Sequence, residues 1–464
     1  MQSDELLKDI CSREEEYGLY NVKIDGISFY HFLRRGVRDK VMQLHELGEN
    51  IKNPSVRKKE RLGFLLKSIW QLLWLIASNR KCDTIFRCFD RLEKVDGLFL
   101  DKFTDPIIDE VFSNKDYIIL EHGRSGRHLT PRKHGNNVIY TEGINLWAWL
   151  AMHLKRRSFY DKNAKQLDDL VSSIEKAFPE ISWDKNGFIT YLTRCYYYRK
   201  AYKSLFNKLQ AKRLFAPARG SFMDIIPAAK ENGMTVFELQ HGVTYSETLT
   251  YSGYLDPQFT PDYFLTFGRI NTPKCYGVSN NQVIEIGWAF ENYIKNSIRQ
   301  QVNSKSVLVI SSPTISLAMV RITCYLAKLF PKVTFCFRPH PNEQLDANRR
   351  YLLSSLPNIS LDDNSESVSV ALMRFDYVIG ENSTVLYEAL AMGKVIGKVC
   401  MEGLIPKYLD EEDVNYFHII KDKETFKQFL NSTNKDKPSK SIYSEFKPEL
   451  LKKIIESNND ISLC

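Results

Sequence analysis

Two short segments in the C-terminal half of the sequence carry side chains that could bind phosphate. The segment FRPHPNE contains Arg338 and His340, which can donate hydrogen bonds to phosphate oxygens, and its two prolines stiffen the loop. The segment GENSTVLYEALAMGK places Ser383 and Thr384 at the expected start of a helix, where hydroxyls, free backbone N–H groups and the helix dipole attract an anion. Taken singly, the hydroxyl residues could be plain helix caps and the histidine a surface residue. Together they predict a site for a phosphorylated ligand.

A carboxylate lies one helical turn beyond these hydroxyls. Glu388 follows Thr384 by four residues and therefore shares its helix face. In that position a carboxylate could accept hydrogen bonds from the two hydroxyls of a ribose. The alternative is an ordinary solvated glutamate. The first interpretation would make the phosphorylated ligand a nucleotide.

Two apolar runs in the N-terminal half end in a histidine followed by a glycine. One run ends at His241, and the other ends at Glu121, which precedes the second histidine. An imidazole titrates near physiological pH, so His241 can take a proton from an acceptor hydroxyl or, when charged, steady a departing phosphate. We rank His241 first as a catalytic base and Glu121 second, while Asp105 and Glu238 are also chemically able. A structural or substrate-positioning role is the alternative for each.

The loop after Glu121 contains basic side chains and two glycines. His122, Arg124 and Arg127 lie in it, directly after an apolar run. Such a loop suits contacts with an acceptor sugar, a phosphate or the tail of a donor. We therefore expect these three residues to contact the acceptor or a phosphate.

Parallel sheets must position these segments. From residue 306 onward, short apolar runs alternate with helical patterns, which predicts βαβ units. The predicted strands there are 306–313, 334–341, 376–382 and 394–400. Further strands are predicted at 82–90, 116–123, 136–143, 213–220, 235–242, 262–268 and 282–288. Ligands of open α/β sheets bind at the carboxyl ends of strands, which is where the candidate residues lie.

The polar stretch 288–305 separates the two sets of strands and is expected to link two domains. The sequence thus predicts an N-terminal Rossmann-like domain with helical insertions (1–290), a C-terminal one (291–440) and a final helical segment (441–464). A chain of 464 residues also exceeds what one hydrophobic core usually organises.

The composition excludes several classes of protein. Hydrophobic residues make up 43% and charged residues 26%, which is ordinary for a globular protein. The nine cysteines are scattered without a C-x-x-C, which argues against a disulfide framework or structural zinc and favours a reducing compartment. The N-terminus lacks a secretory signal, so a cytoplasmic location is expected. The net charge of +8 is small and dispersed, so nucleic acid is not an expected partner.

One basic and apolar segment could meet a membrane surface. Within residues 57–77, the basic cluster RKKER precedes the apolar run FLLKSIWQLLWLIA. This composition is typical of an interfacial membrane-binding helix. The apolar run is shorter than the roughly 20 residues that span a bilayer. The alternative is a buried helix whose preceding basic residues are exposed to solvent.

Three of these motifs, in their order and spacing, resemble those of bacterial surface-polysaccharide transferases of the GT-B fold. They are the histidine–glycine strand end at His241, the HP loop at His340 and the helix start at Ser383 and Thr384. The families concerned include capsule and O-antigen transferases, polysialyltransferases and teichoic-acid glycerophosphotransferases of the CDP-glycerol type. The resemblance implies an α/β chain of the GT-B class, with two Rossmann-like domains facing a central cleft. It also implies an acceptor site in the N-terminal domain and a final helix that crosses back to that domain.

The resemblance also implies roles for individual residues. In such families the HP histidine and the Ser/Thr residues hold the nucleotide and phosphates of the donor. Donor binding is therefore assigned to His340, Ser383 and Thr384, with Arg338 and Glu388 beside them. The chain contains no D-x-D sequence, the motif with which metal-dependent transferases of the other major fold hold the donor. No metal and no other cofactor is therefore expected.

We thus expect an enzyme, a glycosyltransferase that moves a sugar from a nucleotide-sugar donor to a lipid-linked surface-polysaccharide glycan, at the cytoplasmic face of the inner membrane. UDP-sugars, UDP-galactofuranose among them, are the first choice of donor. Glu381 and Glu388 lie closer in sequence than the paired glutamates of retaining GT-B enzymes, so inversion at the anomeric carbon is expected. The nearest alternative is a CDP-glycerol-type polyol-phosphate transferase. An alternative of another class is a non-catalytic nucleotide- or glycan-binding assembly protein.

Overall fold

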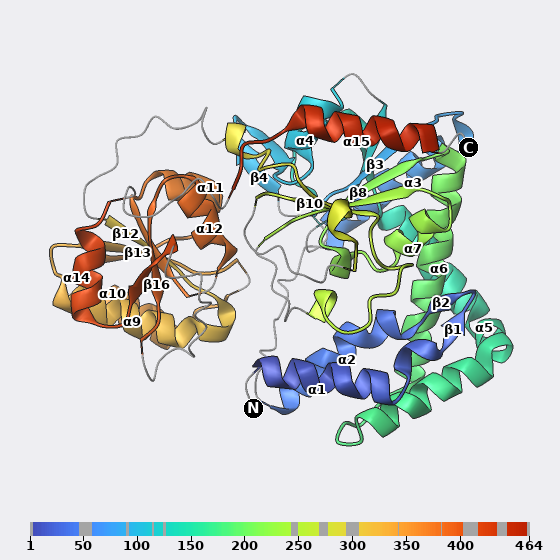
Figure 1. Cartoon of the computed structure of the whole chain (residues 1–464), viewed down its shortest axis with the longest axis horizontal. Helices are drawn as coiled ribbons and strands as arrows, with labels where there is room; N and C mark the ends of the chain where they lie inside the picture. The colour runs from blue at the N-terminus through green and yellow to red at the C-terminus, as the bar shows by residue number, and fades with distance from the viewer. Residues whose placement is uncertain are drawn as a thin grey trace.

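Two large parallel sheets, one in each half of the chain, organise the molecule (Figure 1). The computed structural model describes residues 3–45, 58–89, 92–113, 116–123, 127–242, 249–268, 277–293, 306–341, 343–381, 383–401, 416–433 and 443–461. The predicted α/β class with two Rossmann-like domains is confirmed.

The N-terminal domain is built on a seven-stranded sheet in the order β11-β10-β9-β8-β3-β6-β7. Its strands are β3 (Thr84–Arg87), β6 (Tyr117–Glu121), β7 (Val138–Tyr140), β8 (Arg213–Pro217), β9 (Thr235–Leu239), β10 (Tyr263–Thr266) and β11 (Val283–Glu285). Strands β3, β6 and β8 are buried along their whole length, as expected of strands covered on both faces. All seven strands are parallel, so the segments that follow them emerge at one edge.

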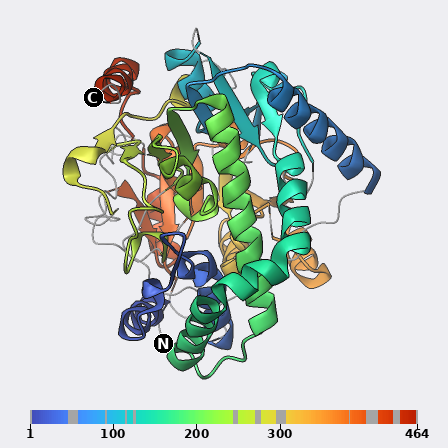
Figure 2. The same ribbon diagram turned by 90° about the vertical axis from the view of Figure 1, so that its right-hand side faces the viewer.

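Helices and two small antiparallel hairpins surround this sheet (Figure 2). The helices are α1 (Ser3–Glu16), α2 (Tyr30–Leu44), α3 (Lys58–Ala77), α4 (Asp105–Val111), α5 (Glu142–Ala177), α6 (Lys185–Leu209) and α7 (Ile225–Lys230). The hairpins pair β1 (Lys23–Ile24) with β2 (Ile27–Ser28), and β4 (Leu92–Val95) with β5 (Leu98–Asp101). Helices α1 and α2 share a core with the second half of α5, in which Ile10, Leu33 and Leu170 are buried together. This helical extension places α2 beside α6.

The C-terminal domain has a six-stranded parallel sheet in the order β14-β13-β12-β15-β16-β17. Its strands are β12 (Ser306–Ile310), β13 (Thr334–Arg338), β14 (Ile359–Leu361), β15 (Tyr377–Gly380), β16 (Val395–Val399) and β17 (His418–Ile420). Its helices are α9 (Ser316–Leu329), α10 (Ala347–Ser354), α11 (Val368–Met373), α12 (Thr384–Ala391) and α14 (Lys423–Leu430). Val307 belongs to the core on one face of the sheet and Leu308 to the core on the other. Alternate residues of β12 are therefore buried on opposite sides.

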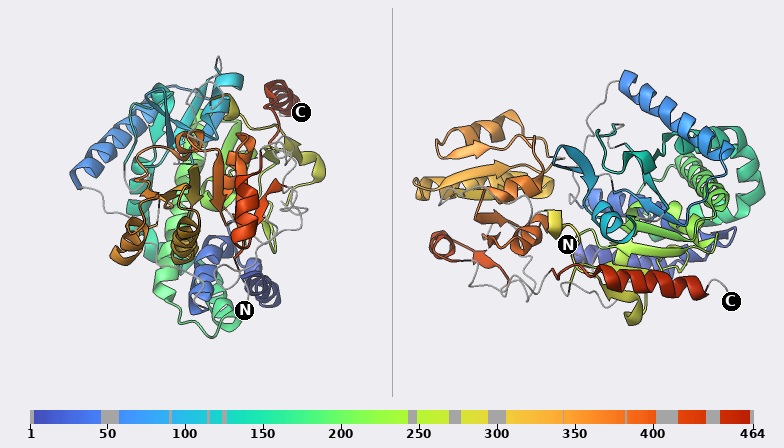
Figure 3. Two further views of the ribbon diagram at one scale, coloured as in Figure 1. Left: turned by 90° about the vertical axis from the view of Figure 1, so that its left-hand side faces the viewer. Right: turned by 90° about the horizontal axis from the view of Figure 1, so that it is seen from above.

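The end of the chain returns to the N-terminal domain (Figure 3). Ser444 donates to the carbonyl of Phe267 (2.9 Å), and helix α15 (Pro448–Ile461) then packs against α4. Leu451 and Ile455 of α15 are buried in the same core as Ile107. The last helix thus belongs structurally to the domain in which the chain begins.

Helices α3 and α5 present large apolar side chains to solvent. The exposed residues are Leu62, Leu66, Trp70, Leu73, Trp74 and Ile76 on α3, and Trp147, Trp149, Leu150 and Leu154 on α5. The opposite face of α3 is docked, because Leu75 is buried and the Ser68 hydroxyl donates to the carbonyl of Tyr140. One face of this helix is therefore core and the other is open. Among the described residues, the structure contains no helix with the length and apolar character needed to cross a membrane.

Candidate functional site

The carboxyl end of β9 leads into a turn that positions His241. Gln240 holds this turn, because its side chain donates to the carbonyl of Gly242 (3.1 Å) and accepts from the backbone N–H of Phe267 (2.8 Å). His241 is half-buried, and its ring centre lies 5.2 Å from that of Phe89. The imidazole therefore stands at the edge of the sheet where α/β proteins bind ligands.

Gly242 brings this turn against the C-terminal domain. A Cβ atom placed on Gly242 would lie only 2.9 Å from the Oγ1 of Thr384, at the start of α12. The absence of a side chain permits this approach. Ser383 caps the same helix, since its hydroxyl accepts from the backbone N–H of Val385 (3.3 Å). The histidine–glycine turn of one domain thus meets a helix N-terminus of the other.

The HP loop lies at the same edge of the C-terminal sheet. Glu343 closes the loop, because its carboxylate accepts from the backbone N–H of His340 (2.9 Å) and from the hydroxyl of Ser311 (3.0 Å). Strand β12 lies between β13, which precedes this loop, and β15, which precedes α12. His340, Ser383 and Thr384 therefore share one edge, where phosphate oxygens could accept from backbone and side-chain donors.

Arg338 holds two segments of the C-terminal domain together in this structure. Its side chain is buried, with Nη1 donating to Asp362 (3.0 Å) and Nη2 donating to the carbonyl of Glu366 (2.6 Å). These contacts tie the end of β13 to the segment after β14. The arrangement supports His340 and the start of α12, rather than Arg338, as the groups that could face a phosphate.

Glu388 lies at the contact between the two domains. Its Oε1 accepts from Nζ of Lys102 at 2.6 Å, and Lys102 is also 3.7 Å from Glu93. All three side chains are buried, and burial raises the pKa of Glu93. No described residue donates a hydrogen bond to Oε2 of Glu388. The solvated-glutamate alternative is therefore wrong, because this carboxylate is buried in an ion pair, and its contact with a ribose stays a prediction.

Glu121 is held in a buried network. Its carboxylate contacts Nδ1 of His128 (2.7 Å) and Nε of Arg132 (2.8 Å), while Arg132 also pairs with Asp105. Burial works to raise the pKa of Glu121, but the contacts with His128 and Arg132 lower it overall. Burial raises the pKa of Asp105 to about 6. Both carboxylates are buried and their oxygens already contact His128 or Arg132, so a substrate hydroxyl would have to displace these partners, and the geometry favours structural roles for Glu121 and Asp105.

Glu238 has a similar structural position. Its carboxylate pairs with the side chain of Arg219 and accepts from the Tyr251 hydroxyl (2.8 Å). It is only 1% exposed. The three acids considered as bases are thus buried in ion pairs, whereas His241 is half-buried at its strand end. The geometry therefore favours His241 over them.

The remaining candidates lie in the loop after β6. The ring of His122 lies 3.2 Å from the Thr141 hydroxyl, and Arg127 is exposed. Arg124 lies outside the described residues. Strands β3 and β8 separate β6 from β9, so this loop shares the sheet edge with His241 at a distance of roughly 14 Å across three strand spacings. The structure does not bring His122 and Arg127 to the turn at His241.

Within the described ranges, no three or more His, Cys, Asp or Glu side chains converge in a way that could hold a metal ion.

Comparisons with known proteins give a likeness in structure and not in sequence. No protein-family model matches the chain, and no curated protein matches it. The UDP-GlcNAc 2-epimerase from Methanocaldococcus jannaschii has a TM-score of 0.51 at 11% identity, covering 81% of this chain and 99% of that one. The chain has the GT-B fold. At this identity the likeness shows the fold alone.

Two further solved structures are similar to the chain at lower scores. A UDP-GlcNAc 2-epimerase from Neisseria meningitidis, bound to UDP-GlcNAc, has a TM-score of 0.47 at 14% identity, covering 82% of this chain and 99% of that one. The wall teichoic acid polymerase TagF has a TM-score of 0.42 at 13% identity, covering 88% of this chain and 100% of that one. At these scores and identities, neither structure indicates the substrate of this chain.

Proposed function

We propose that this GT-B protein is a glycosyltransferase that moves a sugar from a nucleotide-sugar donor, a UDP-sugar in the first instance, to a surface-polysaccharide glycan. The observation that supports the proposal most is the meeting of the His241 turn with the N-terminus of α12. The donor's phosphates would accept hydrogen bonds from His340 and from the helix start. The sugar would then lie between these groups and His241.

The proposed reaction inverts the anomeric carbon in one displacement. An acceptor hydroxyl oxygen forms the new bond to that carbon while the bond to the phosphate oxygen breaks. His241 takes the hydroxyl proton as a general base. The nucleoside diphosphate leaves with the bonding electrons, and the donors of α12 and His340 stabilise its charge. The proposal includes no metal, because those groups would offset the charge of the diphosphate.

Replacing His340 with alanine should weaken nucleotide binding by about tenfold or more, because a donor to the phosphates is lost. The measurement is a thermal-shift panel of UDP, CDP, CMP, GDP and their sugars in the presence of EDTA. The wild type should be stabilised by one nucleotide class, by about 2.7 kcal/mol at 100 times Kd. His153→Ala changes an exposed histidine on α5 and serves as the matched control.

Each outcome of this panel has a definite meaning. Selectivity for UDP that is reduced in His340→Ala and kept in His153→Ala supports the proposal. Selectivity for CDP would instead favour transfer of a polyol phosphate. Stabilisation that persists fully in His340→Ala would place the donor elsewhere, and no stabilisation by any nucleotide would contradict nucleotide-sugar chemistry.

We also propose that the acceptor is carried by a membrane lipid and that the protein docks on the cytoplasmic surface of the inner membrane. The exposed face of α3 and α5 supports this, since Trp70 is 65% and Leu154 is 83% exposed on it. Exposed Lys155 and Arg157 follow the apolar stripe on α5. Tryptophan and leucine beside basic residues suit the interface of an anionic bilayer.

Changing Trp70 and Leu73 together to glutamate should abolish binding to vesicles of phosphatidylglycerol and phosphatidylethanolamine. The reason is that charge would replace the apolar area that enters the interface. Co-sedimentation measures the bound fraction. Tyr351→Glu is the matched control, because Tyr351 is 69% exposed on α10 of the other domain. Equal binding by the double variant and the wild type would contradict this docking face.

A further inference from the structure

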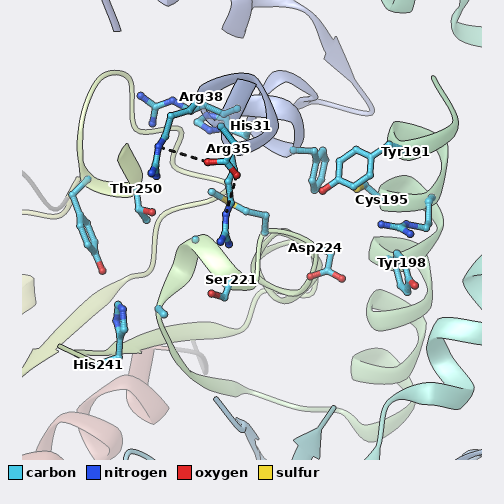
Figure 4. Close-up of a pocket in the computed structure, with 18 residues that line it drawn as sticks. His31, Arg35, Arg38, Tyr191, Cys195, Tyr198, Ser221, Asp224, His241 and Thr250 are labelled. Atoms are coloured by element: carbon cyan, nitrogen blue, oxygen red, sulfur yellow. Dashed lines mark ion pairs between the residues drawn. The ribbon is translucent and has the colours of Figure 1, made fainter. Parts of the chain in front are cut away.

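A cavity of about 500 Å³ opens within the N-terminal domain beside His241. Its walls come from α2, from α6 and from the segment between β8 and α7 (Figure 4). Figure 4 shows His241 on one side of the cavity, Arg35 and Arg38 above it and Tyr191 and Tyr198 on the far side. The proposed base is therefore one wall of a space large enough for a sugar unit or more. The donor groups His340 and Thr384 are not among its lining residues.

Cationic side chains outnumber anionic ones around this cavity. Four arginines and two aspartates are among the lining residues. Arg34 is neutralised by Glu14, to which Nε and Nη2 each donate at 2.8 Å. Arg35 and Arg38 share one carboxylate, that of Asp39, at 4.0 and 3.8 Å. Among the described residues, these two arginines therefore carry more positive charge than their shared carboxylate balances on the α2 side.

The α6 side contributes a third arginine between aromatic rings. Arg194 lies over Tyr191 at 5.3 Å and over Tyr198 at 5.8 Å from the ring centres. Asp224 also lines the cavity, but burial raises its pKa, so its negative charge is disfavoured. The rings restrict the guanidinium while leaving its N–H groups able to meet an anion.

A buried imidazole, one of whose ring nitrogens has no hydrogen-bond partner among the described residues, also lines the cavity. His31 is 4% exposed, and no described residue forms a hydrogen bond with its Nε2. Burial, and then the charge of Arg34, lowers the pKa of His31 to about 3, so the ring is neutral at pH 7. Buried polar atoms are nearly always hydrogen-bonded, so a polar group bound in the cavity would be a suitable partner for this Nε2. A neutral imidazole suits a sugar hydroxyl, which can donate to it or accept from it.

We propose that this cavity binds an acidic unit of the acceptor glycan, one that carries a carboxylate or a phosphate, and presents its hydroxyl to His241. Arg35, Arg38 and Arg194 would hold the anionic group, and His31 a neighbouring hydroxyl. This inference rests on the proposed transferase function and names the chemical class of its acceptor. The sequence motifs do not indicate the charge of the acceptor, whereas this inference requires the acceptor to be negatively charged.

The test compares three short oligomers by isothermal titration with the full chain. They are an oligogalacturonate, which carries carboxylates, an oligomer of glycerol phosphate, which carries phosphodiesters, and a neutral maltooligosaccharide of matched length. At least one acidic oligomer should bind about tenfold or more tightly than the neutral one. Arg38→Gln and Arg194→Gln should each weaken that binding by about tenfold or more. Arg321→Gln, an exposed change on α9, should have no effect.

Nucleotide stabilisation of the same variants separates this inference from the proposed function. If nucleotides bind normally but all three oligomers bind equally or not at all, the inference of an acidic acceptor is wrong. The proposed transferase function would not be affected. Loss of nucleotide affinity in Arg194→Gln would also overturn the inference of an acidic acceptor, because the cavity would then serve the donor. Acidic-oligomer binding without any nucleotide binding would support the cavity and contradict the proposed function. The acidic oligomer that binds more tightly shows whether the cavity prefers a carboxylate or a phosphodiester.

Discussion

Replacing His241 with alanine should lower turnover by roughly 100- to 10,000-fold, the range in which a general base contributes, while nucleotide affinity stays unchanged. The expectation follows from the position of His241. It follows β9 and directly precedes Gly242, the residue that meets the start of α12. It also lines the cavity proposed for the acceptor and is less deeply buried than the acids first considered beside it. The measurement is kcat and KM with the donor that the nucleotide panel selects.

Two matched variants separate catalysis from packing. His241→Gln keeps a polar side chain near the Phe89 ring and should be as inactive as the alanine variant, because an amide cannot take the proton. Glu121→Gln should instead lower the melting temperature, since it weakens a buried network with His128 and Arg132. A His241→Ala enzyme that retains kcat within about threefold of wild type would show that the base lies elsewhere.

Lys102→Met should destabilise the protein by about 3 kcal/mol or more, because breaking a buried ion pair leaves charge without compensation. Lys102 is the cation between the carboxylates of Glu388 and Glu93, and all three side chains are buried where the domains meet. The measurement is the apparent melting temperature and the urea midpoint of the variant.

A second substitution checks the cause of this loss. In Lys102→Met with Glu388→Gln, one of the unpaired carboxylates is neutralised, so part of the lost stability should return. Lys332→Met removes an exposed lysine before β13 and should leave the melting temperature nearly unchanged. If Lys102→Met had the same melting temperature as the wild type, the ion pair between the domains would not contribute to stability.

Four of the six strands of the C-terminal domain were predictable because their signal is local. Continuous apolar runs predict β12, β13, β15 and β16, and the observed strands fall within the predicted ranges or within a residue of them. The start of α12 was equally accessible, since Ser383 is a common type of N-cap and caps the helix here. Short, half-exposed elements such as β4 and β14 were missed, because their side chains do not alternate or cluster strongly enough.

The partners of the charged residues could not be predicted. Lys102 and Glu388 are separated by 286 residues, and no local pattern in either segment indicates that they meet. Arg338 looks like a phosphate ligand in sequence, yet Asp362 holds it inside the domain. The cavity could not be predicted either, because α2, α6 and His241, which line it, lie far apart in the sequence. The three arginines within residues 34–38 were the available sign of a basic helix face, but only the fold shows that they oppose Arg194.

The most direct test of the proposed donor site is a crystal structure of the chain with the nucleoside diphosphate that stabilises it. We predict density for the diphosphate at the carboxyl edge of the C-terminal sheet, between the His340 loop and the residues that begin α12, with its outer phosphate toward His241. Density for the diphosphate in the cavity between α2 and α6, or away from α12, would contradict the account.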